Sequence, residues 1–562
     1  MSIEKLRPRT RDFDISDPSD LSLAKFGNVN AVIDEANSII DEINLELELI
    51  EDSISKYDGE PFQFTVKTDN TGTSASDQFT IDLDENYKYL ITIDWGDGST
   101  STVREYNSAL LTHTYASAGT YTVKIKGSGD SIKFTSDPQK VLEIQKWGML
   151  YLQPSNFSGC RNMTVTATDV PTYGEDLSFV FFDCRLMTDI PGIGAWDMSG
   201  VRNISGMFEQ CYVFNGDITT WDTSNISDMS ILFRNARLFN QDISGWDTSN
   251  VSNMYAMFNF AYVFNQPIGN WNTSKVTRID RMFWDANAFN QDIDTKTVNA
   301  GLPNEYVAWD VSNVTKMEYV FYHADVFNQP LGNWNTSNVT TMGWMFLRAY
   351  QFNQPSINNW DTSKVTNMTQ MFKDTAFNHP LNNWDTGNVL RMDNMFENVT
   401  EFDQEVGMWN VSSVNDIESM FQNAQSFNNG GSDSIKNWDI TNCKNRMFDM
   451  FRGATSFNQP IGSWNMSDIT SLSSILNGAT SFNQDISTWN IRNITNFSNL
   501  LSGNSAMDTD KIDAIYINWS KQPLQTNMSL NLGTNTYSAA AVEARALLTD
   551  VYGWTIIDGG LV

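Results

Sequence analysis

A single pattern of apolar and polar positions repeats along the chain from about residue 147 to residue 503. Most copies are 24 to 26 residues long, and the copy that begins at Trp271 carries an insertion of 13 residues, at 294–306. A fixed period of this length is the signature of stacked repeats, because one short copy has too few neighbours to bury its own apolar side chains. The tryptophans that mark the copies are Trp196, Trp221, Trp246, Trp271, Trp309, Trp334, Trp360, Trp384, Trp409, Trp438, Trp464 and Trp489.

Each copy contains two segments with a recognisable period. The spacing Val-x-x-Met-x-x-Met-Phe-x-x-Ala predicts a short helical segment with one inward face. The segment Ile-x-x-Trp predicts one short strand per copy, stacked into a parallel ladder. We therefore predict a fold class that is mainly β with short helices, a leucine-rich-repeat-like solenoid of about 14 repeats. At about 4.8 Å per strand the array is roughly 65 Å long.

An asparagine recurs at one position of almost every copy. Side chains of this type satisfy backbone groups at the corners of stacked repeats, so we interpret the column as a structural ladder. Asp403 is the only break in it. The column consists of Asn215, Asn240, Asn265, Asn290, Asn328, Asn353, Asn378, Asn428, Asn458 and Asn483.

The recurring sequence Phe-Asn-Gln-Asp/Pro-Ile-x-x-Trp followed by Val-Thr-x-Met-x-x-Met-Phe resembles the BspA-like repeat proteins. That family is leucine-rich-repeat-like and consists of bacterial surface proteins, with members also in mobile-element and viral chains. The resemblance covers about 400 residues and implies a surface role for residues 141–505. Residues 506–562 break the repeat and predict two helices and a final strand, which would form a C-terminal cap.

The N-terminal segment has a different period. Apolar residues at spacings of 3 and 4 alternate through residues 22–57, which predicts a helix with a coiled-coil seam. Isoleucine at both core positions favours a homotrimer, and packing of this helix on its own chain is the alternative. Residues 1–21 read as an extended arm, either a docking peptide or a solvated tail, whose basic residues are Lys5, Arg7, Arg9 and Arg11. The seam residues are Phe26, Val29, Ile33, Ala36, Ile40, Ile43, Leu47 and Ile50.

Residues 58–140 alternate as strands do. The sequence Asp94-Trp-Gly-Asp-Gly98, followed by His113-Thr-Tyr115 and Gly119-Thr-Tyr-Thr-Val123, resembles a PKD-type module. The resemblance implies an immunoglobulin-like β-sandwich that acts as an extracellular spacer or adhesion module. It also implies a structural role for His113.

The composition limits the function classes. With 36 Lys+Arg against 67 Asp+Glu, the net charge of −31 repels nucleic acid and anionic membranes. The start of the chain has no apolar signal segment, and no apolar run is long enough to span a membrane. Of the four cysteines, Cys160, Cys184 and Cys211 occupy a column that alanine fills in later copies, so we interpret them as small buried residues. Disulfides between stacked copies are the alternative.

We find no catalytic motif and expect no enzymatic activity. The three histidines have no acidic or cysteine partner at metal-ligand spacing, so we expect no cofactor; calcium at acidic corners of the sandwich stays an open alternative. Aromatic residues outside the core columns gather near the insertion and are candidate ligand-binding residues, unless the insertion covers them. They are Tyr255, Phe260, Trp284, Tyr319, Tyr322 and Trp344.

The order of arm, helix, sandwich and repeats is typical of virus fibres. We therefore expect a phage virion fibre or appendage on the virion surface, attached to other virion proteins through its N-terminus. The repeats would bind a host-surface glycan or protein. A bacterial cell-surface adhesin is the first alternative, and an intracellular protein-interaction scaffold is the second.

Overall fold

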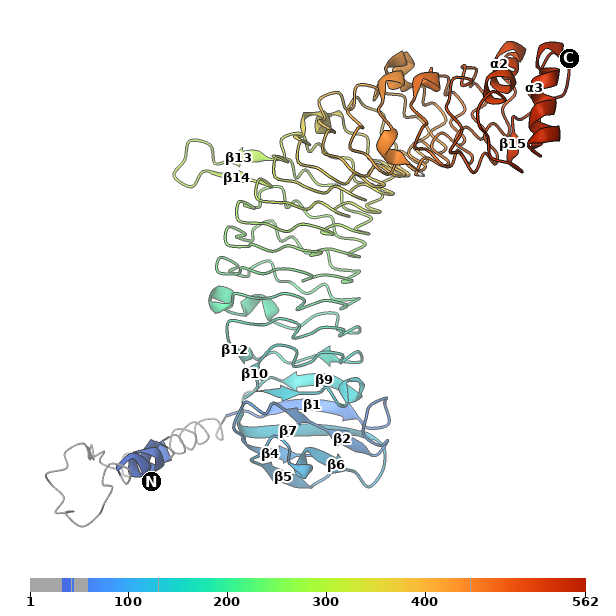
Figure 1. Cartoon of the computed structure of the whole chain (residues 1–562). Coiled ribbons are helices and arrows are strands. Elements are labelled where there is room, and N and C mark those ends of the chain that lie inside the picture. The colour runs from blue at the N-terminus through green and yellow to red at the C-terminus, as the bar shows by residue number, and fades with distance from the viewer. Residues whose placement is uncertain (1–32, 42, 45–58, 130, 445) are drawn as a thin grey trace, which may run out of the picture.

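The computed structural model describes residues 33–41, 43–44, 59–129, 131–444 and 446–562 (Figure 1). Residues 33–41 are helical, and in them Ile33, Ala36 and Ile40 are partly exposed. Ile43 is 50% exposed. The remaining residues of the predicted seam and the basic arm lie outside the described residues: Phe26, Val29, Leu47, Ile50, Lys5, Arg7, Arg9 and Arg11.

The first β-region is an open sheet packed against shorter strand pairs. The sheet order is β11-β9-β1-β7-β4-β5, and β2 pairs with β6 while β3 pairs with β8. Phe64 of β1 lies 6.0 Å from Phe79 of β2, measured between ring centroids, so aromatic rings fill the space between the two layers. The strands are β1 (Phe62–Lys67), β2 (Gln78–Thr80), β3 (Asp82–Leu83), β4 (Leu90–Asp94), β5 (Thr100–Val103), β6 (Thr112–Thr114), β7 (Thr120–Ser128), β8 (Ile132–Lys133), β9 (Val141–Lys146) and β11 (Thr164–Val165).

His113 has structural contacts in this region. Its ring stacks on Trp95 at 4.9 Å, and its Nε2 lies 2.8 Å from the Asp97 carboxylate. Partial burial by itself would raise the pKa of Asp97, but hydrogen bonds from Ser99 and His113 lower it to about 2. These contacts fix the turn between β4 and β5.

The β-region continues directly into the repeats. Strand β9 pairs antiparallel with β1 on one side and parallel with β11 on the other, so one sheet spans both parts. The next pair, β10 (Tyr151–Leu152) and β12 (Thr172–Tyr173), is also parallel. We call residues 147–503 the repeat stack. The sheet therefore covers the first apolar layer of this stack.

Successive repeats lie on one another and form a long curved body (Figure 1). Within runs of successive repeats, parallel bridges join one residue to its counterpart in the next repeat, about 4.8 Å apart. The stacked tryptophan rings on another edge, such as Trp221 and Trp246, are 6.1 Å apart. The wider spacing at the rings makes the stack curve toward the bridged edge. Bridged runs connect Asp176, Asn203, Asp228, Asn253 and Arg278, then Lys316, Thr341, Asn367, Arg391 and Asp416.

The predicted helical segments are wrong. The described Val-x-x-Met-x-x-Met-Phe-x-x-Ala segments form consecutive turns in which alternate N–H groups bond to the next repeat. A helix would use these groups within its own segment. In one repeat, Met254 donates to Arg278, Ala256 to Asp280, Phe258 to Met282 and Phe260 to Trp284, at 2.7–3.1 Å.

The predicted position of the strand is also wrong. The parallel bridges fall between the Val and Met positions of each repeat, at residues such as Asn253. The Ile-x-x-Trp segments are irregular or form 3-10 turns. These 3-10 turns and those elsewhere in the chain are Ala109–Leu111, Pro138–Lys140, Ile193–Ala195, Met198–Gly200, Pro355–Asn359, Asn429–Gly431, Asp433–Asn437, Thr441–Cys443, Ile461–Ser463 and Ala539–Ala541.

The core of the stack consists of aromatic columns. Phe233 and Phe258 are 5.8 Å apart in neighbouring repeats, and Phe258 also lies 3.9 Å from Phe264 of its own repeat. From Trp221 to Trp489, the indole N–H of each column tryptophan reaches back to the preceding repeat, as when Trp271 donates to the Ile243 carbonyl at 3.2 Å. The four cysteines are buried and free, so the interpretation as small buried residues is confirmed and the disulfide alternative is wrong.

The asparagine ladder is confirmed. The Asn353 side-chain oxygen accepts the backbone N–H of Asn378 at 3.0 Å, and Asn378 accepts that of Asp403 at 3.1 Å. Asp403 replaces the amide oxygen by a carboxylate oxygen and accepts the Asn428 N–H at 2.7 Å. The position therefore needs an acceptor oxygen at this place, which both side chains supply.

Two further elements complete the chain. The insertion forms a hairpin of β13 (Lys296–Val298) and β14 (Tyr306–Ala308), which projects from the outer side of the curve (Figure 1). At the C-terminal end, α2 (Thr509–Trp519) and α3 (Val542–Ala546) lie beside the last repeats, followed by one π-helical turn (Leu547–Val551). Strands β15 (Ser529–Asn531) and β16 (Thr555–Ile557) pair in parallel, and Leu530 bridges Phe497 of the last repeat.

Candidate recognition face

The six candidate aromatic residues lie together on the repeat stack. Trp284 and Tyr319 stack at 5.2 Å, and Tyr319 and Trp344 stack at 4.9 Å with their planes 2° apart. Tyr322 meets Trp284 edge-on at 5.0 Å, and Phe260 lies 5.8 Å from Trp284 in the preceding repeat. All of them are partly exposed.

Two arginines join Tyr255 to this group. The Arg278 guanidinium lies 4.4 Å from the Tyr255 ring centroid, and it also pairs with Asp280 at 3.1 Å. Arg281 lies over Tyr319 at 5.2 Å and over Trp284 at 5.5 Å, and its Nη1 donates to the Tyr255 hydroxyl at 3.2 Å. We call the six aromatic residues with Arg278 and Arg281 the first row.

Three members of the first row share one turn position with left-handed backbone. Arg281, Tyr319 and Trp344 occupy the same position in successive repeats, with φ of 63°, 58° and 61°. The position is the third residue of a turn, which requires positive φ and favours glycine or asparagine. Gly206 at 61° and Asn394 at 57° follow that preference in other repeats, whereas Phe179 at 57° and Ile231 at 50° do not. Large side chains at such a position are strained, so stacking alone does not explain why this stretch carries them.

The hairpin of the insertion makes its bonds elsewhere. The Tyr306 hydroxyl donates to the Asn270 carbonyl at 2.6 Å, and Thr295 donates to the Trp309 carbonyl at 2.6 Å. Asn304 and Tyr306 line a hollow beside the corner at residues 244–249. The hairpin thus packs against the edge of the stack that carries the tryptophan column. It does not cover the first row, whose side chains stay partly exposed.

A second row, which sequence reasoning missed, continues the first. From residue 185 to residue 262, arginine and tyrosine alternate at the residue after the Ala/Cys column, and each guanidinium lies over a neighbouring ring. Arg185 and Arg237 lie 5.0 and 4.1 Å from the Tyr212 centroid, and Arg237 lies 5.7 Å from that of Tyr262. Tyr262 meets Phe260 of the first row at 6.2 Å. We call the two rows together the aromatic–arginine face.

Exposed aliphatic residues flank the second row at the next position of the repeats. Leu186 is 53% exposed, Leu238 51%, Val263 38% and Val326 42%. Beyond residue 376 both positions change character. They hold Thr400 and Glu401, Gln425 and Ser426, Thr455 and Ser456, then Thr480 and Ser481. An alignment of the repeats would have found this change, because the two positions after the Ala/Cys column vary from repeat to repeat.

His323 lies beside the first row and contacts two aspartates. Its Nδ1 contacts the Asp285 carboxylate, and its Nε2 lies 3.4 Å from Asp325. Burial raises the pKa of the Asp285 carboxyl, although the hydrogen bond with His323 opposes that rise. Burial also raises the pKa of the Tyr319 hydroxyl. These contacts hold the turn at His323 in place.

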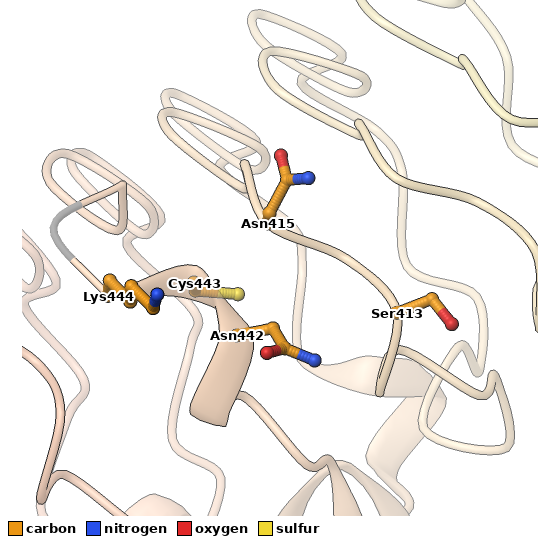
Figure 2. Close-up of a pocket in the computed structure, with 5 residues that line it drawn as sticks. All are labelled: Ser413, Asn415, Asn442, Cys443 and Lys444. Atoms are coloured by element: carbon orange, nitrogen blue, oxygen red, sulfur yellow. The ribbon is translucent and has the colours of Figure 1, made fainter.

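The hollow at residues 413–444 has little chemistry to offer. Ser413 and Asn415 line it from one repeat, and Asn442, Cys443 and Lys444 from the next (Figure 2). Burial raises the pKa of the Cys443 thiol to about 12, so this thiol is no nucleophile at neutral pH. Across the described part of the chain, no three His, Cys, Asp or Glu residues converge as a metal site would require. In the same residues no helix has the length and apolar character to cross a membrane.

Comparison with known protein families supports the repeat assignment. A family model described as "Mycoplasma protein of unknown function, DUF285" matches residues 175–296, 295–402, 355–444 and 429–533. The chain belongs to this DUF285 family. The matches together span 359 of the 562 residues, and they agree with the resemblance to BspA-like repeats of surface proteins. No curated protein matches the chain.

Proposed function

We propose that this DUF285 protein is a non-enzymatic adhesive protein that binds a host-surface partner through the aromatic–arginine face. The observation that carries the proposal is the run of Arg281, Tyr319 and Trp344 at positions where the turn favours glycine. Backbone strain that packing does not require is a mark of functional positions. Trp, Tyr and Arg are also the residue types that dominate the energetics of protein interfaces.

The finer architecture belongs to the same proposal. The repeat stack is a leucine-rich-repeat-like solenoid, the β-region is a PKD-type spacer, and residues 22–57 form a trimeric coiled coil. The arm at residues 1–21 docks to other virion proteins, so that the chain serves as a virion fibre or appendage. Supporting this proposal are the helix at residues 33–41 and the sheet that joins β-region and stack.

Loss of adhesion tests the recognition role. The paired change Tyr319→Ala with Trp344→Gly should lower binding to host cells at least tenfold, because both rings leave the face. The matched control is Thr455→Ala with Thr480→Ala, in the half of the stack that carries small polar residues. If the two variants bind as well as the wild-type chain, the face has no part in adhesion and the proposal fails.

The alternative setting is a bacterial cell surface, which membership of DUF285 favours. Mass spectrometry of purified virions against washed cell envelopes separates the two, and detection in the envelopes alone would overturn the virion role. A mass of three times 63.6 kDa in solution tests the trimer. A monomer with residues 1–57 intact would contradict it.

A further inference from the structure

Resting on the proposed function, we infer that the partner of the aromatic–arginine face is a protein surface that presents carboxylates beside apolar side chains. A glycan is the competing class of partner. The two classes need different features of an aromatic cluster, so the arrangement of the rings and arginines separates them.

The ring faces of the first row are mostly occupied. A sugar packs its C–H groups on the electron-rich face of an aromatic ring, so it needs a face that is free. Tyr319 has Trp284 on one side at 5.2 Å and Trp344 on the other at 4.9 Å. Trp284 lies between Tyr319 and Phe260, with Arg281 above it. Trp344 ends this stack of three rings, and Gln370 stands at the same position of the following repeat. Within this stack of three rings, the outer face of Trp344 is the one platform left for a sugar.

Two arginines of the face have no carboxylate partner within the described residues. Arg278 pairs with Asp280 at 3.1 Å, and Arg185 pairs with Asp183 at 2.6 Å. In contrast, Arg237 and Arg281 have ring partners, and neither has a carboxylate within 4.0 Å in the described ranges. The chain has 67 acidic residues for 36 basic ones, so unpaired guanidinium groups are unexpected. Stacking on a ring orients a planar guanidinium, which is suited to bidentate contact with a carboxylate.

The aliphatic border decides between an acidic glycan and an acidic protein. Leu186, Leu238, Val263 and Val326 are each more than a third exposed and flank the arginines. Aliphatic side chains contribute little to sugar binding, whereas aromatic, arginine and apolar residues together form the centre of protein interfaces. Seven repeats carry the face, and with rings about 6 Å apart it is roughly 35 Å long, which suits an interface of standard size.

Paired probe arrays test the inference. The full chain is applied to a peptide array in which every acidic peptide with leucine or aromatic residues has a twin with Asn and Gln in place of Asp and Glu. The same chain is applied to a glycan array that includes neutral, sialylated and uronate-containing oligosaccharides. Binding is measured for the wild-type chain and for Arg237→Gln, Arg281→Gln and Trp344→Gly. Arg452→Gln, whose position lies in the polar half, is the matched control.

We expect acidic peptides to bind, their amide twins to bind at least tenfold more weakly, and Arg237→Gln and Arg281→Gln to reduce binding to a similar extent. Raised salt should weaken this binding, and Arg452→Gln should leave it unchanged. Binding to a glycan that depends on Trp344 and not on Arg281 would overturn the inference, as would the absence of any acidic peptide among the ligands. The adhesion assay on Tyr319 and Trp344 is independent of this result. It therefore separates a wrong class of partner from a wrong proposed function.

Discussion

Replacing Trp344 by glycine tests whether this ring serves binding without being needed for the folding of the stack. Its backbone has φ of 61°, the conformation that glycine adopts freely and that Gly206 already has at the same position of another repeat. The ring is partly exposed, whereas the ring of Phe346, two residues later, is fully buried. We expect Trp344→Gly to remove binding and to leave the stack folded.

The change in the free energy of unfolding caused by Trp344→Gly is the sum of opposing contributions. Relief of left-handed strain at Trp344 stabilises the variant by about 1 to 2 kcal/mol. The greater freedom of glycine in the unfolded chain costs about 0.5 to 1 kcal/mol. Loss of the stacked contact with Tyr319 costs about 0.5 to 1.5 kcal/mol, and loss of the partly buried ring area costs about 1 kcal/mol more. The net destabilisation is therefore about 1 kcal/mol, against about 3 to 5 kcal/mol for Phe346→Ala.

Hydrogen exchange measures this difference in the affected repeat. The N–H groups of Trp344 and Phe346 bond to the carbonyls of Thr369 and Met371 at 2.8 and 3.0 Å, so their protection reports the local free energy of opening. Asn394→Gly is the matched control, since it makes the same backbone change without an aromatic neighbour, and we expect an effect of roughly 0.5 kcal/mol or less. Equal loss of protection in Trp344→Gly and Phe346→Ala would place the Trp344 ring in the core and refute the reasoning.

Three further predictions concern the stack itself. Asn353→Asp should be nearly neutral, because Asp403 fills the same position, whereas Asn353→Ala should cost about 1 to 3 kcal/mol by leaving the Asn378 N–H unsatisfied; equal melting temperatures would contradict the ladder. The four buried thiols should resist alkylation in the folded chain and react after denaturation, and rapid labelling of any of them would contradict their burial. Burial raises the pKa of Asp416, so its contribution to stability is fully present below its unfolded-state pKa of 3.8 and is lost as the pH rises through the higher folded-state value. Asp416→Asn should therefore reduce the fall in melting temperature as the pH rises from 3.8 toward neutrality, and an unchanged fall would show that Asp416 does not titrate in this way.

The sequence predicted the columns of the stack better than its backbone. Period, buried rings, small Cys positions and the asparagine ladder all follow from which residue types recur, and the structure places them as expected. The helical segments were wrong because the spacing of Met254, Met257, Phe258 and Ala261 fits one face of a helix and also fits consecutive turns. The two conformations differ in where their N–H groups bond. Whether the segment forms a helix or consecutive turns depends on the next repeat, 24 residues away, so the spacing within one repeat does not predict it.

The candidate site was predicted in part, for a related reason. Aromatic residues that interrupt a repeat are visible in one copy, so all six aromatic members of the first row could be named from the sequence. The arginines were missed, because their significance lies in ring contacts between neighbouring repeats. Arg237 is an ordinary surface residue in its own repeat, and it becomes part of a row only between Tyr212 and Tyr262.

The left-handed position explains how a regular stack can carry an irregular surface. The third residue of each turn must adopt positive φ whatever its side chain, because inter-repeat hydrogen bonds fix the backbone on both sides of it. Its side chain is not among the apolar columns of the core, so a substitution there changes the surface and costs only the local strain of about 1 to 3 kcal/mol. Arg281, Tyr319 and Trp344 accept that cost in three successive repeats, where Asn394 and Gly206 avoid it. Because neighbouring side chains in this column stack, each added ring offsets part of the strain of the next. A stacked row is therefore one form in which large residues at this position become stable enough to be displayed.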